Sequence, residues 1–488
     1  MLKKISAAIN TTHRLVRDEL ILRYPLGRAS RAGRGKAAAV HAAISAFGGE
    51  TPNVGDVIRK VSLCITSRVT GLVSDIDLDR GDYPFILDAV NRFAQTTGKT
   101  IYRLTNRGTW RSMRSARVKD WPPKPGNSGY VELAIVDRNG RLVDRLSVNL
   151  WRPVGGGYEA MARSAPVKKV LDANSTLDVR SDAYAEPIDV VYTWVNADDP
   201  AWRAMIASHR ELSLADHDRY VQTDELKYSL RSLFAFAPWV RTVFIFTNCA
   251  PPEWFKPSPR VQWVMHDEVI PDRYLPLFSS HAIETFLHDI PGLSERYIYF
   301  NDDVFLSGPV RPSDFFNAYG HSVSRMEPSG VIELLAQRAK VGDAEEWQYA
   351  AVNCANLMLQ AAGVLPSKLH CHAPHAYSRT VYNELAEAFA PELEVTRAAR
   401  FRQNTDFSFS SFLYHHFALW KGKSQHIDEE AMIVRATNYK RFLTQEIYSK
   451  QRFFCINDGG GSAQDEGFRR FKKAFLERYY SFKSEAEI

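Results

Sequence analysis

The chain has 488 residues, of which 45% are hydrophobic and 24% charged, a composition typical of a globular protein of roughly two or three domains. A chain of this length buries a sizeable core without help from disulfides, and it contains no run of about 18 apolar residues, which excludes a transmembrane helix. The net charge of +6 is concentrated in residues 1–36, where nine Lys or Arg face two Asp or Glu.

The cysteine pattern indicates a reducing compartment. The five cysteines are scattered and include no CxxC pair, which indicates reduced thiols and argues against a disulfide framework and against a zinc site. The first residues also lack the apolar core and cleavage site of a secretory signal. We therefore expect a cytoplasmic protein.

Both ends of the chain are basic, and two interpretations stay open. Residues 1–36 and the stretch 468–483 could bind an anionic membrane surface, such as the inner face of the plasma membrane, or could be solvated charge on packed helices. The second stretch adds aromatic residues near helical spacing: Phe468, Phe471, Phe475, Tyr479 and Phe482. No nucleic-acid-binding motif is found, so nucleic acid is not an expected partner.

Shifts in composition and the Gly-rich and polar stretches between them divide the chain into five parts. The expected parts are a basic helical leader (1–50), a small α+β module (51–165), a linker (166–187), a larger α/β domain (188–460) and a basic amphipathic helix (461–488). In the module, two alternating apolar runs flank Asn139-Gly140, a strong signal for a β-hairpin.

The larger domain alternates strand and helix patterns. Strands are expected at 188–195, 242–248, 261–266 and 297–302, and an amphipathic helix follows Thr223, a plausible N-cap. This alternation predicts an α/β fold with a mostly parallel sheet and flanking helices, in which ligands bind at the carboxyl ends of the strands. Polar residues stand at those ends: Asn196, Asn248, His266, Asn301, Asp302 and Asp303.

Asn301, Asp302 and Asp303 directly follow a core strand. Two adjacent carboxylates repel one another and are costly to desolvate, so a bound cation or a solvated turn should offset that cost. A hard ion such as Mg²⁺ combines carboxylates with phosphate oxygens of a substrate. The acidic-turn alternative has equal weight on these residues alone.

Three further segments carry candidate chemistry. His370, His372 and His375 lie within six residues, but Pro374 interrupts helical zinc-ligand geometry, so a general base or phosphate-stabilising imidazole fits better, with structural histidines as the alternative. Arg402 precedes an aromatic-rich helix and suits a phosphate. Asn457-Asp458 precede three glycines, which permit close approach of a ligand.

The order of these segments resembles the four conserved regions of the Stealth family. The resemblance runs from about residue 188 to residue 458 and is most specific around 275–305, which contains the Asn-Asp-Asp. Stealth proteins are hexose-1-phosphate transferases of bacterial capsule synthesis, related to the N-acetylglucosamine-1-phosphotransferase that marks lysosomal enzymes. Membership implies a GT-A-like α/β catalytic core.

The resemblance also implies roles for individual residues. His372, Arg402, Asp302 and Asp303 match the catalytic positions, and Asp302, Asp303 and Asp458 would hold Mg²⁺ or Mn²⁺. Contacts with the donor or substrate are then expected from Asn196, Arg219, Asp224, Glu225, Arg231, Asn301, His375, Asp406 and Asn457. From spacing alone, the favoured interpretation of the residues around Asp224 is the start of a capped amphipathic helix with salt-bridged faces.

The implied reaction moves hexose 1-phosphate from a UDP-sugar, with UDP-N-acetylglucosamine as first candidate, to a hydroxyl of an oligosaccharide or polysaccharide, and it releases UMP. The product would be a phosphodiester-linked capsule or exopolysaccharide, made beside the capsule export machinery. His372 would either accept the acceptor proton or stabilise the phosphate. The alternative is a conventional metal-dependent glycosyltransferase that releases UDP.

Overall fold

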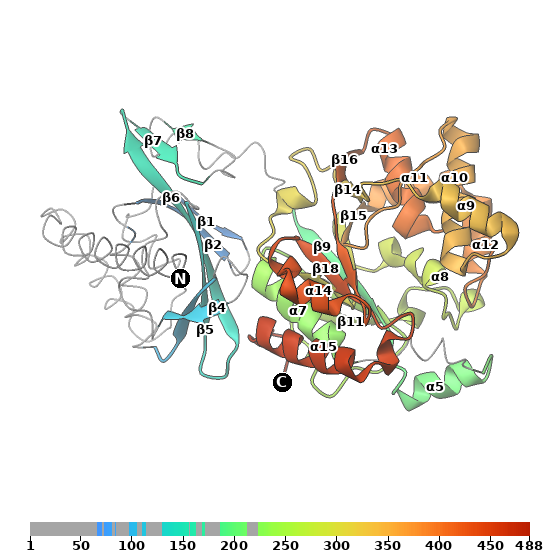
Figure 1. Cartoon of the computed structure of the whole chain (residues 1–488), viewed down its shortest axis with the longest axis horizontal. Coiled ribbons are helices and arrows are strands. Elements are labelled where there is room, and N and C mark those ends of the chain that lie inside the picture. The colour runs from blue at the N-terminus through green and yellow to red at the C-terminus, as the bar shows by residue number, and fades with distance from the viewer. Residues whose placement is uncertain are drawn as a thin grey trace, which may run out of the picture. The chain divides into compact units, whose positions relative to one another are not determined.

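The structure is a computed structural model that describes residues 66–70, 73–80, 83, 97–104, 110–113, 129–155, 157–162, 168–170, 186–211 and 223–488 (Figure 1). The predicted leader at 1–50 and Arg219 lie outside these ranges. The chain forms two compact units, Met1–Arg180 and Ser181–Ile488. Among the described residues, no helix has the length and apolarity that a membrane crossing requires.

The first unit contains an eight-stranded sheet in the order β1-β2-β6-β5-β3-β4, with β7 beside β6 and β8 beside β7. The predicted hairpin forms between β5 and β6: the amide of Asp137 donates to the carbonyl of Arg141 at 2.9 Å, and Gly140 adopts a φ of +79°. The strands are β1 (Thr66–Thr70), β2 (Val73–Asp79), β3 (Thr100–Leu104), β4 (Trp110–Ser112), β5 (Tyr130–Val136), β6 (Leu142–Val154), β7 (Gly157–Ala160) and β8 (Lys169–Val170).

The second unit is built on a five-stranded sheet in the order β11-β10-β9-β12-β15. The first four strands in this order are parallel to their neighbours, and β15 is antiparallel to β12. The predicted α/β class with a mostly parallel sheet and flanking helices is confirmed. The strands are β9 (Ile188–Trp194), β10 (Val243–Thr247), β11 (Val261–Met265), β12 (Arg296–Asn301) and β15 (His375–Ser378).

Helices cover both faces of this sheet, which explains why its strands read as continuous apolar runs. One face carries Tyr192 and Phe300, with Tyr192 hydrogen-bonded to Ser229 of α7 (Glu225–Phe236) at 2.9 Å. The opposite face, with Val191 and Tyr299, packs into a core built largely from the helical segments between α8 (Ser280–Glu284) and α13 (Tyr414–Trp420). Alternate side chains of each strand are therefore buried on opposite sides.

The helices of the second unit are mostly short, and the unit also contains two small sheets. The helices are α5 (Pro200–Ala207), α7 (Glu225–Phe236), α8 (Ser280–Glu284), α9 (Ile332–Val341), α10 (Glu346–Ala362), α11 (Arg379–Ala388), α12 (Ala390–Arg397), α13 (Tyr414–Trp420), α14 (Tyr439–Thr444) and α15 (Glu466–Tyr479). The small sheets are β13-β18-β17 and β14-β16, made of β13 (Val304–Leu306), β14 (Ser322–Met326), β16 (Ser424–Asp428), β17 (Met432–Val434) and β18 (Phe453–Ile456).

The start of α7 differs from the expectation. The N-cap is Asp224, in the left-handed region with a φ of 64°, and not Thr223. The reason is that the Glu225 carboxylate accepts hydrogen bonds from the amide and hydroxyl of Thr223, at 2.6 and 2.5 Å. The Thr223 hydroxyl therefore donates to a side chain and does not cap the helix.

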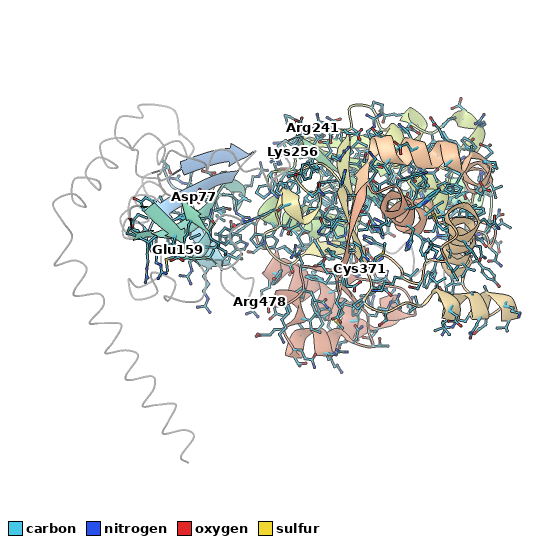
Figure 2. The ribbon with its side chains drawn as sticks, turned by 90° about the horizontal axis from the view of Figure 1, so that it is seen from above. Asp77, Glu159, Arg241, Lys256, Cys371 and Arg478 are labelled. Carbon is cyan, nitrogen blue, oxygen red and sulfur yellow. The ribbon has the colours of Figure 1, made fainter. Side chains whose placement is uncertain are left out.

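The aromatic side of α15 packs inside the second unit. Phe468 and Phe471 lie against Tyr439 of α14, and Phe475 lies against Phe442 and Phe454. Figure 2 shows Arg478 of the same helix with its side chain at the surface. The packed-helix interpretation of this stretch is therefore correct, because a buried aromatic face is not free to enter a membrane.

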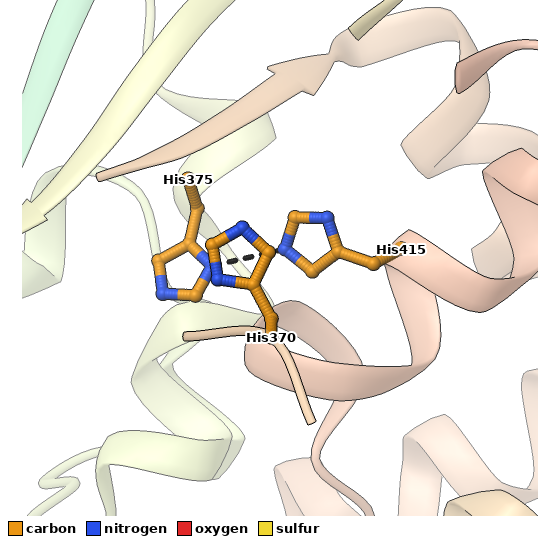
Figure 3. Close-up of side chains that lie close together, drawn as sticks. All are labelled: His370, His375 and His415. Atoms are coloured by element: carbon orange, nitrogen blue, oxygen red, sulfur yellow. Dashed lines mark hydrogen bonds between the residues drawn. The ribbon is translucent and has the colours of Figure 1, made fainter. Parts of the chain in front are cut away.

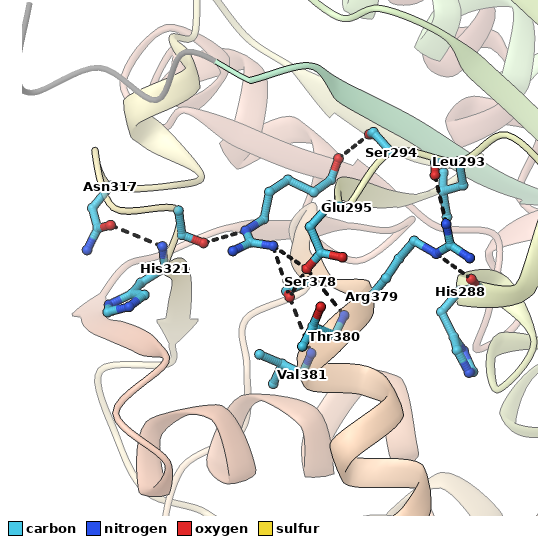
Figure 4. A network of polar contacts seen from close by, with 12 residues as sticks. His288, Leu293, Ser294, Glu295, Asn317, His321, Ser378, Arg379, Thr380 and Val381 are labelled. Atoms are coloured by element: carbon cyan, nitrogen blue, oxygen red, sulfur yellow. Dashed lines mark hydrogen bonds and ion pairs between the residues drawn. The ribbon is translucent and has the colours of Figure 1, made fainter.

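A polar network fixes the amino end of β12, opposite the end that carries the acidic residues (Figure 4). The Glu295 carboxylate accepts from the hydroxyl of Ser378 at 2.6 Å and from the amide of Thr380 at 3.2 Å. Arg379 donates to the carbonyls of His288 and Leu293, at 2.9 and 3.0 Å. These bonds tie β12 to β15 and α11 and hold the strand in register.

Candidate functional site

A cavity of about 1220 Å³ lies at the carboxyl ends of β9, β10 and β12. After β9 the chain adds β10 and β11 on one side of it and then places β12 on the other, so the strand order reverses between β9 and β12. Thr193 and Asn301 are register partners at that reversal and both line the cavity. Ligands of open α/β sheets bind at such a switch point.

The acidic turn between β12 and β13 forms one wall of the cavity, which Asn301, Asp302 and Asp303 all line. Asp303 Oδ2 accepts from Asn457 Nδ2 at 3.0 Å and from Cys455 Sγ at 3.1 Å. Burial acts to raise the pKa of Asp303, but the His372 imidazole and these two hydrogen bonds outweigh it and hold the pKa below its usual range. Asp303 is therefore ionised at neutral pH.

His372 and Arg402 line the same cavity from distant parts of the chain. His372 Nε2 lies 3.8 Å from Asp303 Oδ1, and about a third (34%) of the imidazole side chain is exposed. Arg402, in the loop after α12, donates through Nη2 to the Ser280 hydroxyl at 2.6 Å. Carboxylates, an imidazole and a guanidinium thus surround one space.

Glu284 is a cavity residue that the sequence reasoning missed. It ends α8 and is buried, and its carboxylate accepts from Tyr299 at 3.3 Å and from Ser411 at 3.2 Å. Burial raises the pKa of Glu284 to about 7, although Arg402 and these hydroxyls oppose the shift. The sequence feature that could have identified Glu284 is its carboxylate, which lies between the apolar residues Ala282 and Phe286 of a short helical segment.

Asp458 and Glu225 share one buried cation. Lys472 Nζ of α15 donates to Asp458 Oδ2 at 2.6 Å and also contacts Glu225 Oε1. Burial raises the pKa of Asp458 to about 6; Lys472 lowers it and Glu225 raises it further. Both carboxylates line the cavity, and Asp458 Oδ1 accepts no hydrogen bond from the described residues. Asn457, beside them, also lines the cavity.

Other residues proposed from the motifs lie outside this cavity. Asn196 Oδ1 accepts from the amide of Asp198 in a turn, and Asp224 is exposed at the start of α7. Arg231 is bonded to Glu487 and to the carbonyl of Tyr480. We therefore assign them no contact with a ligand in this cavity.

Asp406 supports the site indirectly, from beneath a cavity residue. Its Oδ2 lies 3.1 Å from Nδ1 of His281, a residue of α8 that lines the cavity. The same oxygen accepts from the amide of Gln403 at 3.0 Å. Asp406 therefore fixes both the His281 ring and the loop that carries Arg402.

The predicted histidine group divides between the cavity and the core. His370 and His375 join His415 of α13 in a stacked cluster, with ring centroids 4.2 and 3.9 Å apart for the two pairs that include His370 (Figure 3). His375 Nδ1 lies 2.9 Å from His415 Nε2, and His370 also lines the cavity. The three rings bring nitrogens within 4.8 Å of one another, but two of these nitrogens bond one another and the His370 ring stacks on both other rings, so we assign the cluster a structural role.

Acid should destabilise the second unit through this cluster. Burial holds the pKa of His375 at about 3 and the pKa values of His370 and His415 well below the usual range, so the folded chain excludes protons that the unfolded chain binds below about pH 6.5. Stability therefore falls as pH drops through that value, by up to ~1.4 kcal/mol per pH unit for each group. We expect the thermal midpoint to decrease accordingly between about pH 7.5 and about pH 5.5.

A matched pair of variants tests whether the histidine cluster causes this dependence of the thermal midpoint on pH. His415→Gln should flatten the dependence of the midpoint on pH, whereas His426→Gln, at an exposed position on β16, should leave the slope of the parent chain. Equal slopes in both variants would contradict the assignment. The readout is the slope, so a uniform loss of stability in His415→Gln does not obscure it.

The donor set around the acidic turn fits a divalent cation. Asp303 Oδ1 is buried and accepts no hydrogen bond from any described residue, and Asp302 stands beside it on the cavity wall. Two carboxylates facing a polar space are ligands that Mg²⁺ and Mn²⁺ accept, the remaining positions being filled by water or phosphate. Asp458 is held by Lys472, which leaves only Oδ1 for an ion.

The sheet order and the cavity at its switch point place the second unit among α/β domains that bind ligands at carboxyl strand ends. Family models for Stealth protein conserved regions 1, 2 and 3 match residues 186–208, 219–324 and 371–419. The chain belongs to the Stealth family. Region 2 contains the acidic turn and Glu284, and region 3 contains His372 and Arg402.

Two named relatives show how far the similarity extends. The capsular polysaccharide phosphotransferase SacB of Neisseria meningitidis is 33% identical over 62% of this chain and 57% of its own length. The exopolysaccharide phosphotransferase SCO6023 of Streptomyces coelicolor is 38% identical over 76% of this chain and 64% of its own length. The chain therefore spans less than two thirds of either relative.

Among solved structures, the galactosyltransferase LgtC is similar over 60% of this chain and 95% of its own, at 8% identity and a TM-score of 0.31.

Proposed function

We propose that this chain transfers a sugar 1-phosphate from a nucleotide diphosphate sugar to a carbohydrate hydroxyl. The observation that carries the proposal is the convergence of Asp303, His372 and Arg402 on one cavity at the sheet's switch point. The names of the relatives, phosphotransferases for capsular polysaccharide and for exopolysaccharide, support the same reaction class. UDP-N-acetylglucosamine is the first donor to test.

In the proposed reaction the acceptor oxygen forms a bond to the β-phosphorus, and the bond from that phosphorus to the oxygen of UMP breaks. Negative charge is spread over the phosphoryl oxygens, so positioning and cationic groups dominate catalysis. Arg402, which lines the cavity, donates the in-plane N–H groups of its guanidinium to those oxygens. Asp302 and Asp303 would hold a divalent ion, which would supply further positive charge to the phosphates.

The acceptor hydroxyl must lose a proton, and two cavity groups are able to interact with it. We assign proton acceptance to His372, because Asp303 lies 3.8 Å from its Nε2 and stabilises the imidazolium that forms. Glu284, with its pKa near 7, binds the acceptor hydroxyl and fixes its approach. The released UMP carries away the electron pair of the broken bond.

Product analysis tests this proposal. The purified full chain is incubated with Mg²⁺, a panel of UDP-sugars and an oligosaccharide acceptor, and the nucleotide products are separated. We expect UMP in an amount equal to the phosphodiester formed, and loss of turnover in excess chelator. Release of UDP in place of UMP would overturn the proposal in favour of a conventional glycosyltransferase.

The proposed location is the cytoplasmic face of the membrane that carries the export machinery. With the aromatic face of α15 buried, this idea rests on the basic residues 1–36. Sedimentation with anionic vesicles, compared between the full chain and one lacking those residues, measures their contribution, and equal sedimentation would refute it.

A further inference from the structure

Three potential metal ligands of different chemistry meet at the acidic turn. They are the carboxylate of Asp303, the imidazole of His372 and the thiol of Cys455, and one ligand atom from each lies within 4.8 Å of the others. Asp303 precedes β13, His372 lies before β15, and Cys455 belongs to β18. The fold, and not a local sequence motif, therefore brings them together.

The distances suit a tetrahedral ion. Zinc binds oxygen, nitrogen and sulfur at about 2.0–2.3 Å, which places neighbouring ligand atoms about 3.3–3.8 Å apart. His372 Nε2 lies 3.8 Å from Asp303 Oδ1, and Cys455 Sγ lies 3.1 Å from Asp303 Oδ2. The ligand atoms of the three residues lie within 4.8 Å of one another, so side-chain shifts of up to about 1 Å bring them to these spacings. The fourth position faces the cavity that His372 and Asp303 line.

The surrounding structure holds two of the three ligands firmly. Cys455 pairs with Val304 in the β13–β18 ladder, and the amide of Ile456 donates to the Asp303 carbonyl at 2.9 Å. Asn457 Nδ2 donates to Asp303 Oδ2 at 3.0 Å, while Asp303 Oδ1 accepts no hydrogen bond from the described residues. An oriented carboxylate with one unsatisfied oxygen is prepared to take a cation.

The donor set also discriminates between ions. Magnesium prefers oxygen ligands, whereas a thiolate and an imidazole favour zinc and chemically similar ions. A thiolate and a carboxylate together balance the charge of Zn²⁺, with the thiol proton released to solvent on binding. Asp303 is common to both arrangements, so the two kinds of ion compete for it.

We propose that Asp303, His372 and Cys455 form a binding site for Zn²⁺ and similar borderline-soft divalent cations, and that an ion bound there inhibits transfer. Inhibition follows because the ion occupies the Nε2 of His372 and the Asp303 carboxylate, which removes the partner that stabilises the imidazolium and the carboxylate that the hard ion requires. The inhibitory part rests on the proposed function, whereas the binding part does not.

Cobalt(II) tests the binding part without any assay of activity. Titration of the full chain with Co²⁺ should give, at one equivalent, the near-ultraviolet charge-transfer band of a cobalt–thiolate bond, and Zn²⁺ should abolish it. Cys455→Ala should remove the band, while Cys354→Ala, at a buried cysteine in α10, should keep it. Absence of the band in the parent chain, or its persistence in Cys455→Ala, would overturn the site.

Two further measurements keep the result decisive. If Cys455→Ala does not fold, His372→Ala, at a partly exposed position, should still change the visible cobalt bands, and unchanged bands would remove His372 from the site. In the transfer assay, the Zn²⁺ concentration for half-inhibition should rise at least about tenfold in Cys455→Ala relative to the parent chain. Full turnover with Zn²⁺ bound would refute the inhibitory part of the proposal but not the binding site. Absence of transfer with every UDP-sugar would refute the proposed function, and the cobalt result would still stand.

Discussion

Replacing Asp303 by asparagine is expected to lower the rate of UMP release by about 100- to 1000-fold while the chain stays folded. The amide keeps the shape of the carboxylate in its place between Cys455 and Asn457. It loses the charge that faces His372 at 3.8 Å and that a divalent ion needs. The measurement is the turnover rate at saturating donor, with the thermal midpoint as the check on folding.

Asp224→Asn is the matched control, because it makes the same chemical change at an exposed position one residue before α7. Asparagine tolerates the left-handed backbone of that position. The sequence motif placed Asp224 among the donor contacts, whereas the structure places it outside the cavity. Full activity in Asp224→Asn with a strong loss in Asp303→Asn supports the geometry, and equal losses would contradict it.

The sheet and the edge that carries the candidate site were predictable because the signals are local. Strands buried on both faces read as continuous apolar runs, and polar residues at their ends stand out against them. The turn that contains Asp302 and Asp303 is such a case. The Asn139-Gly140 hairpin is another, since its backbone requirement is met within two residues.

Neighbours in sequence that diverge in space were not predictable. Asp224 and Glu225 are adjacent, yet the left-handed backbone at Asp224 leaves the first exposed and the second buried against Lys472. His372 and His375 are separated by only two residues, yet one enters the cavity and the other joins His415, forty residues away, in the core. Sequence spacing does not encode these choices, because tertiary packing decides them.

Residues brought in from distant segments carry no local signal at all. Cys455 reaches the acidic turn only because β18 pairs with β13, a contact between positions about 150 residues apart. Lys472 lies on a helix whose charge pattern predicts a solvated or membrane-facing surface, and its burial follows from two carboxylates elsewhere in the chain. Such partners become visible only when the fold is known.

Replacing Lys472 by methionine is expected to destabilise the second unit by about 3–5 kcal/mol, which is the effect of removing one partner from a buried ion pair. The Lys472 side chain is 1% exposed, and its partners Glu225 and Asp458 are 4% and 10% exposed. Burial alone would lower the pKa of Lys472, but the two carboxylates raise it above its usual value. The ammonium is therefore charged, and its removal leaves two carboxylates to repel one another.

Lys473→Met provides the control, since the neighbouring side chain is exposed and should be replaceable without loss. Combining Lys472→Met with Glu225→Gln and Asp458→Asn should recover part of the stability, because the unpaired charges then disappear. A Lys472→Met chain as stable as Lys473→Met would show that the three groups do not form a charged set. Asp458 precedes the glycine loop, and both line the cavity. We therefore expect Lys472→Met also to weaken binding of the proposed donor. Such a result would connect the packing of α15 with the proposed reaction.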